Sequence, residues 1–211
     1  MSNSIDFSKY KEEFFNKVGE NCSKLVEWDG GNYPGNSIFP SEALAVYTLA
    51  KHFEIDLFIE SGIFRGASTF LWSELFSDID IICMDILESP KHQQIVGDVI
   101  NRFSDKDNMD FIIGDSVQEI PKIIEKYSDK RIGIFVDGPK DWMGLDLCVN
   151  SIKNKNVCFT SLHDYTHPYY FSTQTNVEFR KIVGNMNEKH PQIQEYPNGP
   201  GLTVIVGGDD E

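Results

Sequence analysis

The sequence has no apolar run long enough to cross a membrane as a helix. Such a span needs about 18 to 20 consecutive, mostly apolar residues, and no stretch of the chain has them. Residues 1–15 also lack the basic and then apolar layout of a signal peptide. We therefore expect a cytoplasmic protein that does not act at a membrane.

Basic residues are scarce. There are 19 Lys and Arg residues against 33 Asp and Glu residues, which gives a formal charge of −14. A phosphate backbone would be repelled over most of such a surface. This balance argues against a nucleic acid as substrate or partner, although it says little about which small molecule binds.

Cysteines are few and widely spaced. Cys22, Cys83, Cys148 and Cys158 form no C-x-x-C pair. Two of them, Cys83 and Cys158, fall inside apolar runs that we predict to be buried strands, so we expect reduced thiols in the core. A zinc site is not expected.

The length of 211 residues suits one domain with an N-terminal appendage. Within residues 1–40 we predict an amphipathic helix and then a loop rich in Gly, Pro and Asn. This helix would pack across the fold or against a partner subunit, so a homodimer is one expectation. Residues 41–211 are predicted to form the main domain.

Apolar runs alternate with helical patterns along the main domain. Strands are predicted at 56–59, 79–84, 110–113, 132–136 and 156–162, followed by an antiparallel pair at 192–196 and 202–206. This order predicts an α/β fold with a mostly parallel, seven-stranded sheet, helices on both faces, and one antiparallel strand near the C-terminus. Ligands of such sheets bind at the carboxyl ends of the strands.

The turn after the first strand carries the pattern Glu60-x-Gly62-x-x-x-Gly66-x-Ser68. It lacks the middle glycine of the dinucleotide-binding G-x-G-x-x-G pattern, which admits a pyrophosphate. A carboxylate at Glu60 would repel phosphate and suit a cationic amino acid or a sulfonium. The alternative is a glycine turn that only packs a helix on a strand.

This pattern resembles the first motif of class I S-adenosylmethionine-dependent methyltransferases, in the E-x-G-x-x-x-G-x-S form of the catechol O-methyltransferase-like branch. The resemblance implies a Rossmann-like methyltransferase fold and S-adenosylmethionine as cofactor. The residues that it assigns to the cofactor near this turn are Glu60, Gly62, Gly66 and Ser68.

Acidic residues end the next two predicted strands. Asp85 can take both hydroxyls of a ribose, as the terminal acid of a nucleotide-binding βαβ unit does. By the same resemblance, Asp115 contacts the adenine amino group, and Ser116 is assigned beside it. Asp115 and Ser116 would also serve as caps of the following helix, and both roles can hold together.

Charged residues follow the fourth and fifth predicted strands. In catechol O-methyltransferases a D-x-x-K motif supplies a magnesium ligand and a base, and Asp137 and Lys140 match it; Asp164 stands where a second ligand belongs. Tyr165 replaces the expected amide, and a phenol is a poor Mg²⁺ ligand. A related group without a clear metal reads D-G-x-H-x-Y and then H-D-Y. The chain matches it with Asp137-Gly138 and His163-Asp164-Tyr165, and has Lys140 in the His place and Trp142 in the Tyr place. A metal-assisted site, with Mg²⁺ on Asp137 and Asp164, and a metal-free site both remain open.

Proton transfer to His163 is the mechanism that unperturbed pKa values favour. Lys140 would then stabilise the developing alkoxide as a cation, and Asp137 or Asp164 would orient the ring. The alternative is that these residues only form structural hydrogen bonds and ion pairs. Nearby aromatic residues would suit a sugar or a phenol, or a dimer contact: Trp142, Tyr165, Tyr169, Tyr170 and Phe171.

Together these patterns predict a methyltransferase that acts on a hydroxyl of a small molecule, a sugar or a phenol. Two alternatives remain. One is a non-catalytic relative that serves as a binding or assembly module, and the other is a metal-dependent hydroxylase or hydrolase built on the Asp/His cluster.

Overall fold

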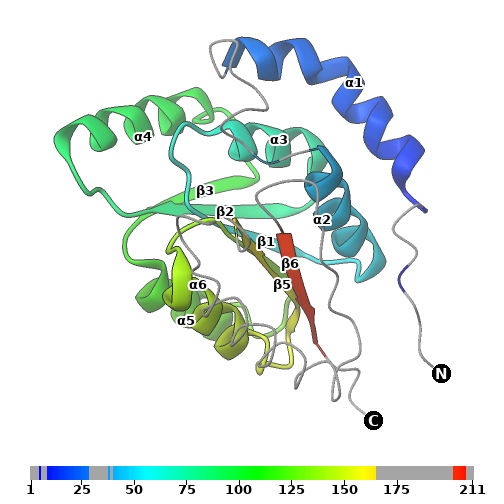
Figure 1. Ribbon diagram of the computed structural model, residues 1–211, viewed down its shortest axis with the longest axis vertical. Coiled ribbons are helices and arrows are strands. Elements are labelled where there is room, and N and C mark those ends of the chain that lie inside the picture. Colours follow the sequence, from blue (N-terminus) through cyan, green and yellow to red (C-terminus); the bar gives the residue numbers. More distant parts are fainter. Residues whose placement is uncertain (1–4, 6–8, 29–37, 39, 165–201, 208–211) are drawn as a thin grey trace.

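A computed structural model describes residues 5, 9–28, 38, 40–164 and 202–207. Its centre is a six-stranded sheet in the order β3-β2-β1-β4-β5-β6 (Figure 1). Five strands run parallel, and β6 pairs antiparallel with β5. The strands are β1 (Leu57–Ser61), β2 (Asp80–Asp85), β3 (Met109–Ile113), β4 (Ile132–Val136), β5 (Val157–His163) and β6 (Leu202–Val206).

The mostly parallel sheet with one reversed strand is confirmed, and the five parallel strands lie where they are predicted. The described residues contain six strands rather than the seven expected. The expected strand at 192–196 lies outside the described residues. Strand order reverses between β1 and β4, which is the point where open α/β sheets bind their ligands.

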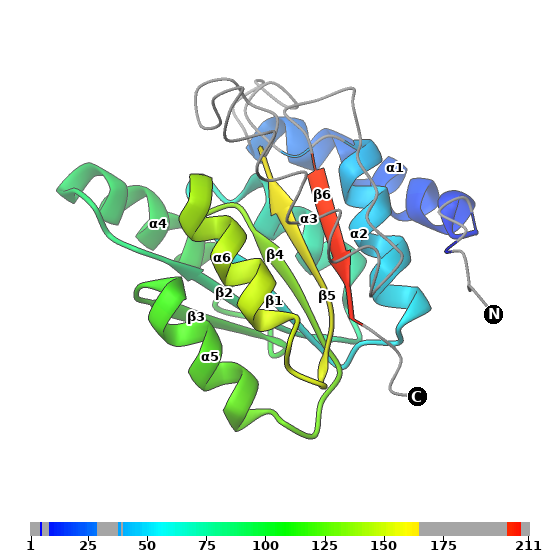
Figure 2. The same ribbon diagram turned by 60° about the horizontal axis from the view of Figure 1, so that its bottom comes forward.

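Helices cover both faces of the sheet, as predicted (Figures 1 and 2). They are α1 (Lys11–Trp28), α2 (Pro40–His52), α3 (Ala67–Leu75), α4 (Pro90–Arg102), α5 (Ser116–Lys126) and α6 (Asp141–Ser151). Buried residues of α1 to α4 form one core with Phe58 of β1, while α5 and α6 form a second core with Leu57 and Ile59. The alternation of neighbouring β1 residues between the two cores follows from the two-residue period of a strand.

The central strands β1 and β4 are buried along their whole length, as expected for parallel strands covered on both faces. Two of the helices that follow strands begin with a side-chain cap. Ser89 Oγ accepts a hydrogen bond from the N–H of His92 at 3.2 Å, and Asp115 Oδ1 accepts one from Val117 at 3.0 Å. These caps place the first turns of α4 and α5 beside the carboxyl ends of the strands.

The N-terminal helix α1 packs against α2 and α3. Phe14 is fully buried, and Val18 joins the same core as the sheet domain. Packing across the fold is therefore confirmed for this helix. Among the described residues, no helix combines the length and the apolar character of a membrane span.

Candidate active site

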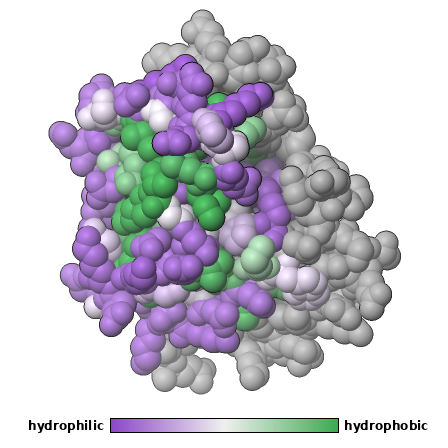
Figure 3. All heavy atoms as spheres, turned by 90° about the vertical axis from the view of Figure 1, so that its left-hand side faces the viewer, coloured by the Kyte–Doolittle hydropathy of each residue, from purple (hydrophilic) through white to green (hydrophobic). Residues whose placement is uncertain are grey.

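A cavity of about 1500 Å³ opens at the carboxyl edge of the sheet. The turns after β1 to β5 and parts of α4, α5 and α6 line it. In Figure 3, hydrophobic side chains form a band on the side of the molecule that is at the left in Figure 1, with hydrophilic side chains around it. The lining includes predicted site residues from both halves of the sheet, among them Asp85 and Asp115 on one side and Asp137 and His163 on the other.

Asp85 ends β2 and lines the cavity, with 8% of its surface exposed. Its Oδ2 accepts hydrogen bonds from the backbone N–H groups of Ile63 and Phe64, both at 2.8 Å. An oxygen that accepts two such bonds has little capacity left, because a carboxylate oxygen has two lone pairs. We expected Asp85 to take both hydroxyls of a ribose; in this structure only its second oxygen, Oδ1, is left for them.

Gly62 brings the turn after β1 against the turn after β4. It has φ +101°, and a Cβ placed on it would lie 2.9 Å from the backbone nitrogen of Gly138. No L-residue with a side chain fits this position without a shift of the backbone. Gly66 adopts φ 76° directly before α3. The two predicted glycines are thus required by the turn itself.

Glu60 and Ser68 do not line the cavity. Glu60 is fully buried and accepts hydrogen bonds from Thr69 Oγ1 at 2.6 Å and from Trp72 Nε1 at 3.1 Å. Burial raises its pKa to about 7, although hydrogen bonds from Ser68 and Thr69 act to lower it. The structure therefore places both residues in the packing of α3 on β1, and Gly66 likewise lies outside the cavity lining.

Asp115 and Ser116 combine the two roles that the sequence allows. Asp115 caps α5 with Oδ1 and accepts a hydrogen bond from Gln118 Nε2 at 3.3 Å with Oδ2. Ser116 Oγ donates to the carbonyl oxygen of Gly138 at 3.3 Å. Both residues also line the cavity, next to the turn after β4.

The end of the cavity beside Asp85 and Asp115 has an apolar wall that is not among the predicted features. Four large apolar side chains that are exposed on the described part of the protein line it: Phe64, Ile86, Val117 and Met143. Exposed apolar side chains that gather in a cavity mark a binding site for an apolar or flat group. Two of these residues could have been identified from their position in the sequence, since Ile86 and Val117 directly follow the predicted residues Asp85 and Ser116.

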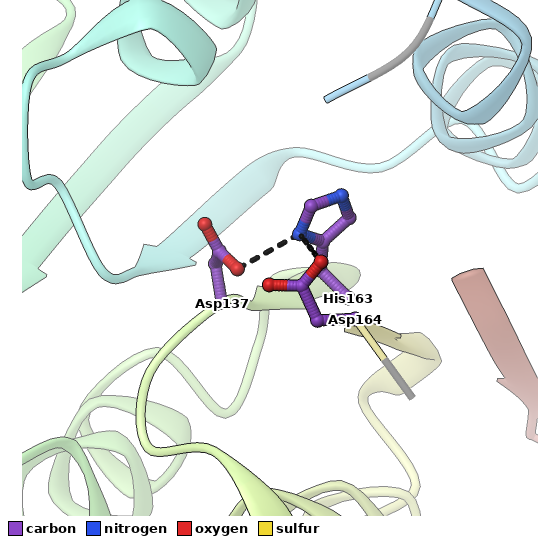
Figure 4. Close-up of side chains that lie close together, drawn as sticks. All are labelled: Asp137, His163 and Asp164. Carbon is purple, nitrogen blue, oxygen red and sulfur yellow. Dashed lines mark hydrogen bonds and ion pairs between the residues drawn. The ribbon is translucent and has the colours of Figure 1, made fainter. Parts of the chain in front are cut away.

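A charge cluster lies at the other end of the cavity: Asp137, Lys140, His163 and Asp164 line the cavity there, and the buried Glu42 contacts His163 from behind. Asp137, His163 and Asp164 point toward one another from the ends of β4 and β5 (Figure 4). His163 Nδ1 lies 2.9 Å from Asp137 Oδ1 and 3.5 Å from Asp164 Oδ1, and its Nε2 lies 3.3 Å from Glu42 Oε2. Lys140 Nζ donates to Asp137 Oδ1 and, at 2.6 Å, to Asp164 Oδ2.

This arrangement sets the charges of the cluster. Burial acts to lower the pKa of His163, but the charges and hydrogen bonds of Asp137, Glu42 and Asp164 raise it to about 10. Burial opposes the ionised form of Asp137, yet the cations of His163 and Lys140 hold its pKa at about 2. Lys140 also has a raised pKa, because Asp137 and Asp164 outweigh its burial. In this arrangement the raised pKa values of His163 and Lys140 favour their cationic forms at neutral pH. The role of His163 as the base stays a prediction.

Asp137, His163 and Asp164 each offer one donor atom, and these atoms lie within 4.8 Å of one another. The two carboxylates, however, already share the ammonium group of Lys140, which lies where a cation between them belongs. As arranged, these residues do not fit Mg²⁺; Tyr165, the third expected position, lies outside the described residues.

The predicted aromatic rim is described only at Trp142. This residue is half-buried and packs against the core formed with α5 and α6, and it does not line the cavity. Tyr165, Tyr169, Tyr170 and Phe171 lie outside the described residues. Glu42, in the first turn of α2, belongs to the charge cluster and is 1% exposed.

No protein-family model matches the sequence, and no curated protein matches it significantly. Solved structures do match over nearly the whole chain. An SAH-bound methyltransferase from Podospora anserina aligns with a TM-score of 0.61 and 16% identity, over 99% of this chain and 100% of that one. An O-methyltransferase from Bacillus cereus in complex with SAH aligns with a TM-score of 0.58 and 15% identity, over 89% and 90% of the two chains.

A third match is the O-methyltransferase TomG from Streptomyces achromogenes, in complex with SAM. Its TM-score is 0.55 at 14% identity, over 90% of each chain. Identities this low carry the fold and not the reaction or the substrate. The chain therefore has the Rossmann-like fold of class I methyltransferases, the fold that the turn motif and the strand-end acids predict.

Proposed function

We propose that the protein is an S-adenosylmethionine-dependent O-methyltransferase that acts on a small molecule. The observation that carries the proposal is the single cavity at the point where strand order reverses. One end of this cavity offers an acid and an apolar wall, and the other offers paired charges that suit an ionising hydroxyl. The likeness to methyltransferases solved with SAM or SAH supports the same assignment.

At the first end, each part of the cofactor has a candidate partner. Within the apolar wall, Ile86, Val117 and Met143 suit the faces of an adenine, and Asp115 suits its amino group. Asp85 suits the ribose. Toward the middle of the cavity, Gly62 permits close approach of a ligand to the backbone, and the negative charge of Asp137 favours a cationic sulfur. The bound cofactor supplies an electrophilic methyl group.

At the second end, His163 and Lys140 act as cations in this proposal, and neither acts as the base. A hydroxyl that binds closer to Lys140 and His163 than to the carboxylates paired with them has a lowered pKa, because its ionised form is stabilised. The acceptor would bind as an oxyanion, and its proton would pass to solvent. Asp137, Asp164 and Glu42 keep the two cations in place.

This role for the charge cluster favours a phenol over a sugar as acceptor. The phenol of a tyrosine side chain has a pKa of about 10, which a modest stabilisation brings near neutrality. A sugar hydroxyl is a far weaker acid and would need a strong base or a metal. Because the described donors do not fit Mg²⁺, no step of the proposal uses a metal.

Two assays test the proposal. In the first, SAH at 100 times its dissociation constant stabilises the protein by about 2.7 kcal/mol in thermal unfolding, and NAD does not. In the second, a methyl group is transferred from S-adenosylmethionine to simple phenols faster than to hexoses. Stabilisation by NAD alone would favour a dehydrogenase, and SAH binding without transfer to any hydroxyl would favour a non-catalytic binding module.

A further inference from the structure

His92 approaches the cofactor end of the cavity from a different element than the predicted residues. It lies in the first turn of α4, where its backbone is held by the cap at Ser89. Its ring lies beside Phe64, with 6.1 Å between ring centroids, and 17% of its side chain is exposed. The residue lines the cavity together with Phe64 and Asp85.

The Nε2 atom of His92 is buried and has no hydrogen-bond partner among the described residues. The nearest acid is Asp85, whose Oδ1 lies 3.5 Å away, which is too long for a hydrogen bond. Buried polar nitrogens without a partner are uncommon in folded proteins, because desolvation without a new hydrogen bond costs free energy. This atom therefore has the capacity to bind a ligand group in the cavity.

A neighbour of this kind would help Asp85 to bind a ribose. Its Oδ2 is occupied by the N–H groups of Ile63 and Phe64, which leaves Oδ1 for a ligand. Two hydroxyls on adjacent carbons point in different directions, so a second partner beside Oδ1 allows each hydroxyl a well-aligned hydrogen bond. Asp85 Oδ1 and His92 Nε2 lie 3.5 Å apart, close enough to serve the two neighbouring hydroxyls of one sugar.

We propose that His92 and Asp85 together bind the ribose diol of the cofactor. One hydroxyl donates to Asp85 Oδ1, and the other pairs with His92 Nε2. The inference rests on the proposed function, since it assumes an adenosine ligand in this cavity. Glu88 is the rival partner for the second hydroxyl, because it also lines the cavity, but its side chain is exposed.

The test is calorimetric titration of the full chain with SAH and with its 2′-deoxy and 3′-deoxy analogues. The variants are His92→Ala, His92→Gln, the rival Glu88→Gln, and Gln93→Ala as a control on the exposed side of the same helix turn. We expect His92→Ala to weaken SAH binding by about threefold to tenfold, the effect of one hydrogen bond. His92→Gln should restore part of the affinity, since a glutamine amide reaches about as far as Nε2.

The analogues identify the hydroxyl. For one of the two deoxy compounds, His92→Ala should cause no further loss, because the partner of Nε2 is already missing. Equal affinity of the wild-type protein and His92→Ala for SAH would overturn the inference, as would an equal loss with SAH and both analogues. A loss in Glu88→Gln with none in the His92 variants would assign the second hydroxyl to Glu88 and also overturn it.

The two proposals fail in different ways. A wild-type protein that binds neither SAH nor S-adenosylmethionine contradicts the proposed function. A wild-type protein that binds SAH with an affinity independent of His92 contradicts only the present inference. Thermal unfolding of each variant without ligand checks that α4 keeps its packing, and His92→Gln provides the test if His92→Ala is unstable.

Discussion

The two ends of the cavity are built in different ways. At the cofactor end, Asp85 and Asp115 are held by backbone N–H groups, and apolar side chains surround them. At the acceptor end, Asp137 is held by the charged side chains of Lys140 and His163. The first end thus has oxygens left for neutral hydrogen-bond donors, whereas the second has side chains of opposite charge that are paired with one another.

This difference separates binding from chemistry. Backbone donors fix an acid in place without adding a formal charge, so the cofactor end suits a ligand recognised by shape and hydroxyl groups. Paired cations and anions set one another's pKa values, so the acceptor end suits a group that changes its charge during reaction. Changes at one end should therefore affect affinity for SAH, and changes at the other should affect turnover.

The largest effect is expected from breaking the acceptor end with Lys140→Met. Methionine keeps the apolar stem and removes the cation that Asp137 and Asp164 share. We expect kcat to fall by about 100-fold to 1000-fold, as when one charge-stabilising group is removed from an active site. SAH affinity, measured by calorimetry, should change by less than about threefold.

The control Lys122→Met removes an exposed ion pair with Glu119 and should leave both quantities unchanged. An equal fall in affinity and turnover for Lys140→Met would erase the distinction between the two ends.

The next effect concerns Glu60, which lies behind the cofactor end. The pKa of Glu60 is raised from 4.5 to about 7 in the folded protein, so the folded state keeps a proton that the unfolded chain releases. The contribution of this residue to stability therefore falls as pH rises from 4.5 to 7, by about 3 kcal/mol. Glu60→Gln cannot titrate, so the variant should gain stability relative to the wild-type protein between pH 5 and pH 8.

Urea unfolding of both proteins at these two pH values measures the change, and all other titrating groups cancel in the difference. A stability difference that stays constant between pH 5 and pH 8 would show that Glu60 keeps one protonation state. SAH affinity should change by less than about twofold, because Glu60 contacts Thr69 and Trp72 and not the cavity. A strong loss of affinity would instead support a direct contact of Glu60 with the cofactor.

A smaller effect is expected at Gly62, where the two ends meet. Gly62→Ala puts a Cβ against the backbone of Gly138 at a residue with φ +101°. We expect the free energy of unfolding to fall by about 2 kcal/mol, the cost of a side chain in left-handed backbone with a close contact. Gly97→Ala is the matched control, since nothing lies within 4 Å of its added Cβ, and helix propensity predicts a gain of up to about 1 kcal/mol. Denaturant unfolding compares the two, and equal effects would contradict the close approach of the two turns.

The smallest effect is expected from removing metal ions. Because Lys140 already bridges Asp137 and Asp164, turnover should stay within about twofold after chelation and dialysis. Steady-state rates before and after the treatment, with and without added Mg²⁺, measure this. Activity that disappears on chelation and returns with Mg²⁺ would show that the ion displaces Lys140 and that the acceptor end is a metal site.

The fold and the location of the site could be predicted from the sequence because both depend on local patterns. Apolar runs ended by Asp85, Asp115 and Asp137 place three acids at one edge of a parallel sheet, whatever the packing details. Side-chain direction depends on more than strand position. Glu60 and Asp85 both end apolar strands, yet Glu60 faces α3 and Asp85 faces the cavity.

The charges of the acceptor end could not be predicted, since they depend on contacts between distant segments. His163 meets Glu42 across 121 positions of sequence, and this contact helps to raise its pKa. His92 was missed for a related reason. A lone histidine in the first turn of a helix has no sequence signal, and its relation to Asp85 exists only once α4 packs beside the turn after β1.

Calorimetric titration of SAH into the wild-type protein and Asp85→Asn tests the central claim most directly. We expect one saturable site in the wild-type protein and an affinity at least about tenfold lower in the variant, because a hydrogen bond to a charged acceptor is lost. No binding to the wild-type protein at millimolar SAH, or equal binding by both proteins, would contradict the assignment of this cavity to an adenosine cofactor.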